Sequence, residues 1–211
     1  IFYRHFTYRD MAKRGGHGTN YYGKPYTMAK HLKVDTEIME DFQDAYFAAF
    51  PGIPRWHSRV AMELQISGKL ITPLGRKRCF FGRRSDDTTL REGIAYEPQS
   101  MVGDILNLGM YKVWRKREEL QIDLMAQLHD AILIQYDENR EDEILPKVMK
   151  ELIVPVPMDD KVLIIPCNAE TGWNWNKAGK DNLDGLKEWS GNDTRRRTES
   201  PTTSVLDRLI S

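Results

Sequence analysis

A histidine and an aspartate, His129 and Asp130, interrupt an otherwise apolar stretch of the chain, LQIDLMAQLHDAILIQYD at residues 120–137. The apolar residues on either side predict two strands, with this pair at the turn between them. An unpaired carboxylate in apolar surroundings is costly, so it takes up a proton or finds a cation. The pair therefore indicates a metal or cation site. Taken in isolation it would instead favour a histidine satisfied by a backbone carbonyl and an ordinary turn aspartate.

A second candidate group recurs at every fourth position near the start of the chain and consists of Arg9, Lys13, His17 and Tyr21. Each such step advances about 40° beyond a full helical turn, so the four share one broad stripe if the helix continues. Two cations, an imidazole and a phenol suit a nucleotide, because cations bind phosphate oxygens and aromatic rings contact sugar or base. Spacing alone favours a solvated basic helix end.

The glycine pair at positions 15 and 16 weakens the interpretation of this segment as a solvated helix end. Each glycine costs about 1 kcal/mol relative to alanine inside a helix, so a pair in mid-pattern indicates close approach by a ligand or another backbone. The chain has no GxxxxGK[ST] sequence, which argues against a P-loop phosphate site.

Composition limits the remaining function classes. Lys plus Arg and Asp plus Glu both number 31, so a basic surface for nucleic acid must be local. Cys79 and Cys167 are far apart and show no CxxC spacing, which argues against a zinc site and a disulfide scaffold and favours a reducing compartment. The sequence contains no long apolar run and no leader pattern, so we expect neither a membrane span nor a signal peptide.

Hydrophobic periodicity predicts the elements that position these residues. We expect helices at 1–14, from Pro25, at 35–50, at 55–67, from Pro98 to about 117 and at 141–153. A strand, turn and strand cover 69–81, and a last strand covers 161–170. The pattern predicts an α+β fold with a mainly helical region at 1–68, a region of strands and a long helix at 69–179, and a flexible polar tail at 180–211.

The motifs carry a family resemblance. RDMAKRGGHGTNYYG resembles the second polymerase motif of family A DNA polymerases, the bacterial DNA polymerase I and phage replicase type, whose core is Arg-x3-Lys-x3-(Phe/Tyr)-x3-Tyr-Gly. LHDA is similar to the third motif, His-Asp-Glu in a hairpin turn. Lesser matches follow the family order: FPGIPRW, TPLGRKR, PQSMVGDILNLGM and ETGWNW. The resemblance covers residues 1–178 and implies helical fingers at 1–68 followed by palm elements on an antiparallel sheet.

The resemblance also implies a role for each matching residue. Arg9 and Lys13 bind the incoming deoxynucleoside triphosphate, His17 covers its sugar, and Tyr21 stacks at the templating position. Gln99 reads the minor groove of the primer–template DNA, and His129 lies near the primer terminus. Asp130 is a ligand of the catalytic Mg²⁺ or Mn²⁺ ions, which support two-metal phosphoryl transfer.

The basic segment GRKRCFFGRR has two interpretations, a solvated loop or a phosphate-contacting surface. With the resemblance in view we favour DNA contact, by Arg76 and Arg78 in particular. Two further residues near the end of the motif series, Trp173 and Trp175, are expected to be core anchors rather than base-stacking residues.

Three positions depart from the family pattern. His17 replaces Phe or Tyr, Tyr22 precedes the motif glycine, and Ala131 stands where a glutamate is usual. The family's other metal-binding aspartate precedes the Arg/Lys helix. We therefore expect an upstream polymerase portion to supply it, and this chain to be inactive without that portion.

We expect the C-terminal part of a template-directed DNA polymerase, acting in the cytoplasm of a bacterial or phage-infected cell. One alternative is a fragment of a single-subunit RNA polymerase, against which TPLGRKR and PQS favour the DNA enzymes. The other is a non-catalytic nucleic-acid-binding subunit.

Overall fold

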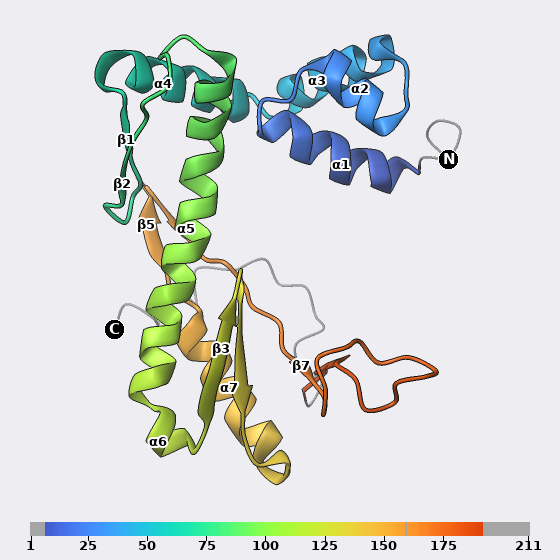
Figure 1. Cartoon of the computed structure of the whole chain (residues 1–211), viewed down its shortest axis with the longest axis vertical. Coiled ribbons are helices and arrows are strands. Elements are labelled where there is room, and N and C mark those ends of the chain that lie inside the picture. The colour runs from blue at the N-terminus through green and yellow to red at the C-terminus, as the bar shows by residue number, and fades with distance from the viewer. Residues whose placement is uncertain (1–6, 159, 192–211) are drawn as a thin grey trace. The chain divides into compact units, whose positions relative to one another are not determined.

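The computed structural model describes residues 7–158 and 160–191 (Figure 1). Most of the predicted tail, residues 192–211, lies outside the described residues. The chain forms two compact units, one of residues 1–104 with 156–158 and the other of residues 105–155 with 159–211. Helices predominate, and short antiparallel strand pairs accompany them, so the predicted α+β class is confirmed. No helix in the described ranges is long and apolar enough to cross a membrane.

The first unit begins with three helices, α1 (Tyr8–Asn20), α2 (Pro25–Leu32) and α3 (Thr36–Ala49). A capping box opens α1, in which the Asp10 amide donates to the Thr7 hydroxyl at 3.1 Å and the Asp10 carboxylate accepts from Thr7. Apolar side chains from these helices and the turn between α2 and α3 form a small core: Met11, Met28, Ala29, Leu32, Val34 and Met39.

The predicted end of the first helix near its glycine pair is wrong, because α1 continues to Asn20. A Cβ atom on Gly15 would lie 2.9 Å from the ring of Phe42, and one on Gly16 would lie 3.3 Å from the ring of Tyr46. The close approach that the glycines indicated is therefore made by aromatic side chains of α3. It needs neither a ligand nor another backbone.

The rest of the first unit contains α4 (Gly52–Ser67), β1 (Lys69–Ile71), β2 (Lys77–Cys79) and the first part of α5 (Asp87–Arg115). The two strands pair antiparallel, as predicted, with Gly75 at φ 84° in the turn between them. A second core lies beneath them and includes Val60, Leu64, Leu70, Phe80, Ile94 and Tyr96.

Helix α5 begins at Asp87, so the prediction that Pro98 opens it is wrong. Proline cannot donate a backbone hydrogen bond and usually marks a helix boundary. Here buried residues lie on both sides of it, Ile94 before and Met101 and Ile105 after. Burial of these side chains stabilises the helix through the proline.

The second unit contains the end of α5, α6 (Arg117–Leu120), the hairpin of β3 (Asp123–Leu128) and β4 (Ala131–Gln135), a 3₁₀ turn η1 (Glu138–Arg140) and α7 (Glu141–Leu152). Its core includes Val113, Leu120, Ile122, Ile144 and Val148. Three short strands follow along the chain, β5 (Val156–Met158), which belongs to the first unit, β6 (Lys161–Leu163) and β7 (Glu170–Thr171). The expected single last strand at 161–170 is thus replaced by β6 and β7. Part of the segment predicted to be a tail folds back as β8 (Lys187–Glu188) and pairs with β7.

Candidate functional site

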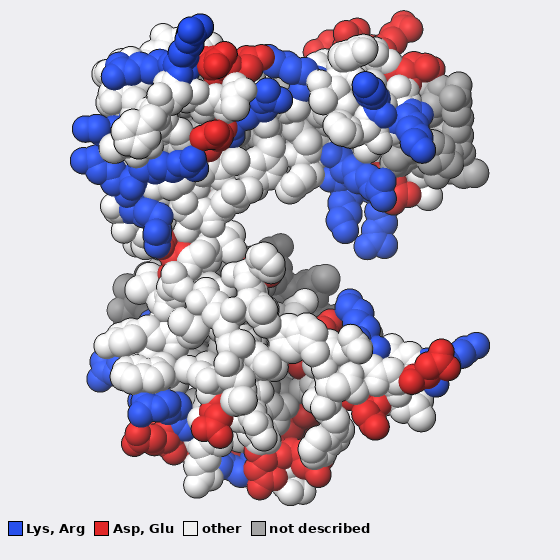
Figure 2. Space-filling view, in the orientation of Figure 1, with Lys and Arg blue, Asp and Glu red and all other residues white. Residues whose placement is uncertain are grey.

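Helix α1 places its polar stripe on the face opposite its buried one. Met11, Gly15, Gly16 and Thr19 are buried, whereas Arg9, Lys13 and His17 are exposed. Figure 2 shows basic side chains gathered along this helix. Arg9, Lys13 and His17 therefore share one exposed face of α1, and their side chains are directed away from the packed helices.

Tyr21, the fourth member of the stripe, follows the last residue of α1 and is half-buried. Its ring centroid lies 4.7 Å from that of His17, with 55° between the ring planes. The exposed cations and His17, with the adjoining half-buried Tyr21, thus form a strip along one side of α1, which has the composition that phosphate and sugar or base contacts require.

Buried polar side chains fix the end of α1 that carries these rings. The Gln43 amide donates to the Thr19 hydroxyl at 3.2 Å and to the Gly23 carbonyl at 2.8 Å. The Tyr46 hydroxyl donates to the Asn20 side chain at 3.1 Å. No local sequence pattern points to these residues, because their contacts join helices that are distant in sequence.

His57 on α4 holds the same end through its ring. Its Nε2 lies 2.8 Å from the Asn20 carbonyl, which can only accept, so Nε2 carries the proton. The ring is buried, with Tyr22 at 5.3 Å edge-on and Trp56 at 5.2 Å. Burial lowers the pKa of His57 below its ordinary value, and the hydrogen bond to Asn20 partly opposes that shift. The neutral ring is the form that fits this position.

The hairpin places His129 and Asp130 at its tip, as predicted, between the paired residues Leu128 and Ala131. His129 has φ 52°, a left-handed conformation that histidine adopts more readily than most residues. Both side chains are exposed, so solvent can satisfy Asp130. The argument that apolar surroundings force Asp130 to take a cation therefore does not hold in this structure.

Asp130 offers one carboxylate to a metal. Across residues 7–158 and 160–191, no three His, Cys, Asp or Glu side chains come together as a group able to hold an ion. Ala131, next to it, has no ligating atom. The described part of the chain therefore does not complete a metal site around Asp130.

The basic segment around β2 is partly neutralised. The Arg76 guanidinium forms a two-pronged ion pair with Asp104, with Nε at 2.8 and 2.9 Å from the two carboxylate oxygens. Arg78 pairs with Glu92 at 3.0 Å, and its guanidinium lies 4.7 Å above the Phe80 ring. The two arginines predicted to contact DNA are thus held by carboxylates of α5.

Gln99 is exposed on α5, two residues after Glu97, a half-buried residue that links α5 to α4. The Glu97 carboxylate accepts from the Trp56 indole at 2.7 Å and from Arg59 at 2.6 Å. Trp56 of the FPGIPRW segment is therefore hydrogen-bonded to the residue that immediately precedes the PQS segment.

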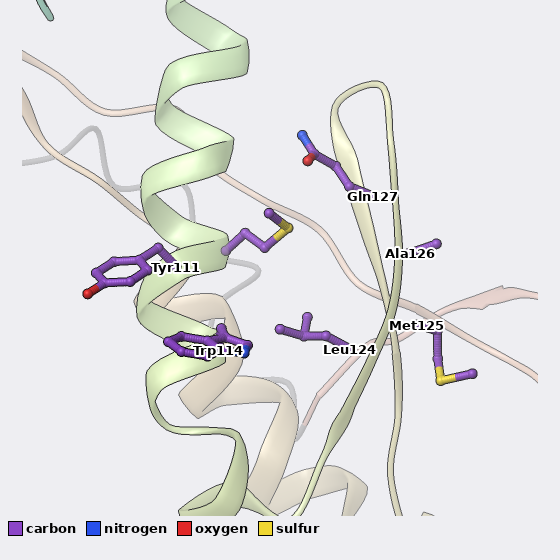
Figure 3. A pocket seen from close by; sticks show the side chains of 7 residues that line it. Tyr111, Trp114, Leu124, Met125, Ala126 and Gln127 are labelled. Atoms are coloured by element: carbon purple, nitrogen blue, oxygen red, sulfur yellow. The ribbon is translucent and has the colours of Figure 1, made fainter.

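An apolar pocket of about 410 Å³ lies between α5 and β3 (Figure 3). Leu124 lies between the helix and the hairpin, whereas Tyr111 points away from the hairpin. The lining contains no carboxylate and no cation and consists of Met110, Tyr111, Trp114, Leu124, Met125, Ala126 and Gln127. This pocket does not have the chemistry of a nucleotide site.

The expectation that Trp173 and Trp175 are core anchors is wrong. Their exposed fractions are 77% and 51%. Each lies near the turn that brings β8 back to β7, where Trp173 donates its backbone amide to the Asp184 carbonyl at 2.8 Å.

Comparison with known proteins identifies the family. The model of DNA polymerase family A matches residues 5–177, which include every candidate residue described above. The chain belongs to DNA polymerase family A. The match ends before the segment that forms β8.

Two relatives show how much of a family A polymerase this chain represents. It is 26% identical over 166 residues to DNA polymerase I of Helicobacter pylori, covering 74% of this chain and 19% of that protein. It is 26% identical over 180 residues to the thermostable DNA polymerase I of Thermus filiformis, covering 82% and 21%. The chain spans about a fifth of the length of these relatives.

A solved structure has the same fold. The POL domain of Pol1 from M. smegmatis, in complex with DNA primer-template and dNTP, superposes with a TM-score of 0.64 at 23% identity. The likeness covers 74% of this chain and 29% of that one. The α+β assignment therefore agrees with a polymerase domain of the family.

Proposed function

We propose that this chain forms the fingers and part of the palm of a template-directed DNA polymerase that adds deoxynucleotides to a primer 3′ end. The observation that carries the proposal is the exposed strip on α1, where Arg9, Lys13 and His17 face away from the packed helices and Tyr21 adjoins His17. Cations beside aromatic rings match a triphosphate attached to a sugar and base.

In this proposal Arg9 and Lys13 bind the phosphates of the incoming nucleotide, and the rings of His17 and Tyr21 contact its sugar and the templating position. Gln99 and His129, both exposed, contact the primer–template DNA. Phosphoryl transfer depends mainly on positioning and on neutralising the charge of the phosphates, so these residues contribute by orientation and charge.

Asp130 contributes one carboxylate to a Mg²⁺ or Mn²⁺ site. Mg²⁺ is commonly held by one or two carboxylates together with substrate phosphates, and it neutralises the charge that develops during transfer. Since the described residues form no group of three ligating side chains, we propose that another portion of the polymerase provides the remaining ligands. The chain by itself is then inactive.

One observation favours a second candidate function. A lone carboxylate followed by Ala131 is also what a non-catalytic subunit would retain, one that binds nucleic acid without transferring nucleotides.

Primer extension separates the two. The 211-residue chain is assayed alone, and then together with a polypeptide that supplies the rest of a family A polymerase, using a labelled primer–template, Mg²⁺ and one deoxynucleotide at a time. The expected result is no extension by the chain alone, and addition of only the template-matched nucleotide by the combination. Extension by neither, with duplex binding intact, would support the non-catalytic alternative.

A further inference from the structure

Phe81 is the most exposed of the large hydrophobic side chains described, with 97% of its surface open to solvent. Its neighbour Phe80 is buried in the second core. A single exposed apolar residue is common on protein surfaces and by itself indicates nothing. The setting of Phe81 is what distinguishes it.

The backbone on both sides of Phe81 is fixed, so the ring is presented outward. Phe80 packs edge-on against Tyr96, with ring centroids 5.9 Å apart. On the other side, a Cβ atom on Gly82 would lie 2.3 Å from the hydroxyl of Thr89, which is buried at the start of α5. Gly82 therefore allows a close approach that a larger residue would prevent.

Three of the cations around Phe81 are not paired with a carboxylate of the described residues, whereas Arg76 and Arg78 are. Lys77 and Arg83 are exposed, and the described residues provide no carboxylate partner for either. Arg84 donates to the backbone carbonyls of Gln65 and Ile66 at 2.9 and 3.3 Å, which leaves its charge unneutralised. This contrasts with Arg76 and Arg78, whose charges are balanced by Asp104 and Glu92.

The local sequence reinforces this difference. Residues 76–84, RKRCFFGRR, contain five cations and no acidic residue. Figure 2 shows Lys and Arg side chains gathered over β1 and β2. The nearest acidic residues along the chain are Asp86 and Asp87, and Asp87 pairs with Lys24 at 3.5 Å.

We propose that Phe81, Lys77, Arg83 and Arg84 form a binding site for single-stranded DNA, in which an unpaired base stacks on the Phe81 ring and the three cations contact the flanking phosphates. Stacking on aromatic rings beside a positively charged surface is the usual means of binding single strands without sequence preference. The site deepens the proposed function, since a polymerase template supplies such a strand, and it replaces Arg76 and Arg78 as the basic contact.

A titration of the full chain with a fluorescein-labelled oligothymidylate, without nucleotide or metal, tests the site. Phe81→Leu keeps an apolar side chain and removes the ring, so affinity should fall about tenfold, whereas Phe81→Trp should retain it. Tyr26→Leu is the control, because Tyr26 is an aromatic residue of the same unit that is also largely exposed, at 70%. Lys77→Ala and Arg83→Ala should each lower the slope of log affinity against log salt by about 0.7.

Equal affinities of wild type and Phe81→Leu, or equal losses for Phe81→Leu and Tyr26→Leu, would overturn the proposal. Losses from Arg76→Ala that match those from Arg83→Ala would also overturn it, since Arg76 is paired. Weakened binding of an apolar peptide, with no change for DNA, would indicate a protein partner instead. Because no nucleotide is added, the proposed polymerase activity can fail while this binding persists, and the reverse also holds.

Discussion

The residues of the strip on α1 combine suitable side-chain types for nucleotide binding with exposure to solvent. Arg9, Lys13 and His17 would be an ordinary solvated helix face on spacing alone. The ring contact between His17 and Tyr21, and the buried contacts that hold the end of the helix, fix the part of the strip that carries the two rings. Pre-organised rings bind a sugar or base with less loss of conformational entropy, which favours the nucleotide interpretation.

Replacing Lys13 should affect nucleotide use far more than DNA binding. In the combined polymerase, Lys13→Ala should raise the KM for the deoxynucleotide by about tenfold, because a hydrogen bond to a charged group contributes ~1.5 kcal/mol or more. Lys30→Ala, on α2, is the matched control and should change neither property. Steady-state kinetics and a duplex titration measure the two effects. Equal losses in both would assign Lys13 to the template.

His57 should make the first unit less stable in acid. Its pKa is lowered in the folded chain, so between the folded and unfolded values the unfolded chain binds a proton that the folded chain does not. Stability therefore falls as the pH drops through this window below about 6.5. Melting temperatures from pH 7.5 to 5.5 should fall less steeply for His57→Gln than for wild type. His31→Gln, at an exposed position, should leave the slope unchanged, and a wild-type slope in His57→Gln would contradict this role.

For single residues, the sequence was sufficient to predict which side chains are candidates for the site, but not which side chains they pair with. The strip on α1 and the pair at the hairpin tip follow from local spacing, which sequence displays directly. The ion pair between Arg76 and Asp104 joins positions that are 28 residues apart, and only the packing of β2 beside α5 brings them together. Because Arg76 and Arg78 are paired with carboxylates, the cations that remain available to bind phosphate in this segment are Lys77, Arg83 and Arg84.

At the scale of elements, strong local sequence patterns were sufficient to predict a helix or strand, whereas weak ones gave wrong boundaries. The β3–β4 hairpin follows from two apolar runs around a two-residue turn, and the structure has it. Pro98 suggested a boundary because it lacks an amide proton, yet α5 continues through it. The cores on either side of the proline outweigh the lost hydrogen bond, and a local pattern does not contain that information.

Helix α5 offers a test of its packing against α7. A Cβ atom on Gly109 would lie 2.9 Å from the Leu152 backbone Cα, so Gly109→Ala should destabilise the second unit by ~1–3 kcal/mol. Gly103, in the same helix but within the first unit, has nothing within 4 Å of its added Cβ atom, so Gly103→Ala should stabilise the first unit by up to about 1 kcal/mol. Urea unfolding of both variants measures the difference. Equal shifts of the same sign would contradict the close approach of α7.

At the scale of the whole molecule, charge is balanced overall and uneven locally. Equal numbers of acidic and basic residues give no net attraction to DNA, and the basic side chains gather over β1, β2 and α1 (Figure 2). A chain that spans about a fifth of the length of its relatives carries the strip of cations and rings on α1, a basic surface and the carboxylate of Asp130. Because the chain has basic surfaces but does not complete a metal site in its described residues, we expect the chain alone to bind DNA without catalysing nucleotide addition.

The most direct test of the central claim is the rate of primer extension by the combined polymerase in Mg²⁺, with Asp130→Asn compared with wild type. Removing the carboxylate should lower the rate by about 100-fold or more, since it takes away a metal ligand while preserving shape. Asp142→Asn, at an exposed position in the first turn of α7, is the control and should retain full activity. Equal rates for Asp130→Asn and wild type would show that this chain does not contribute to the metal site.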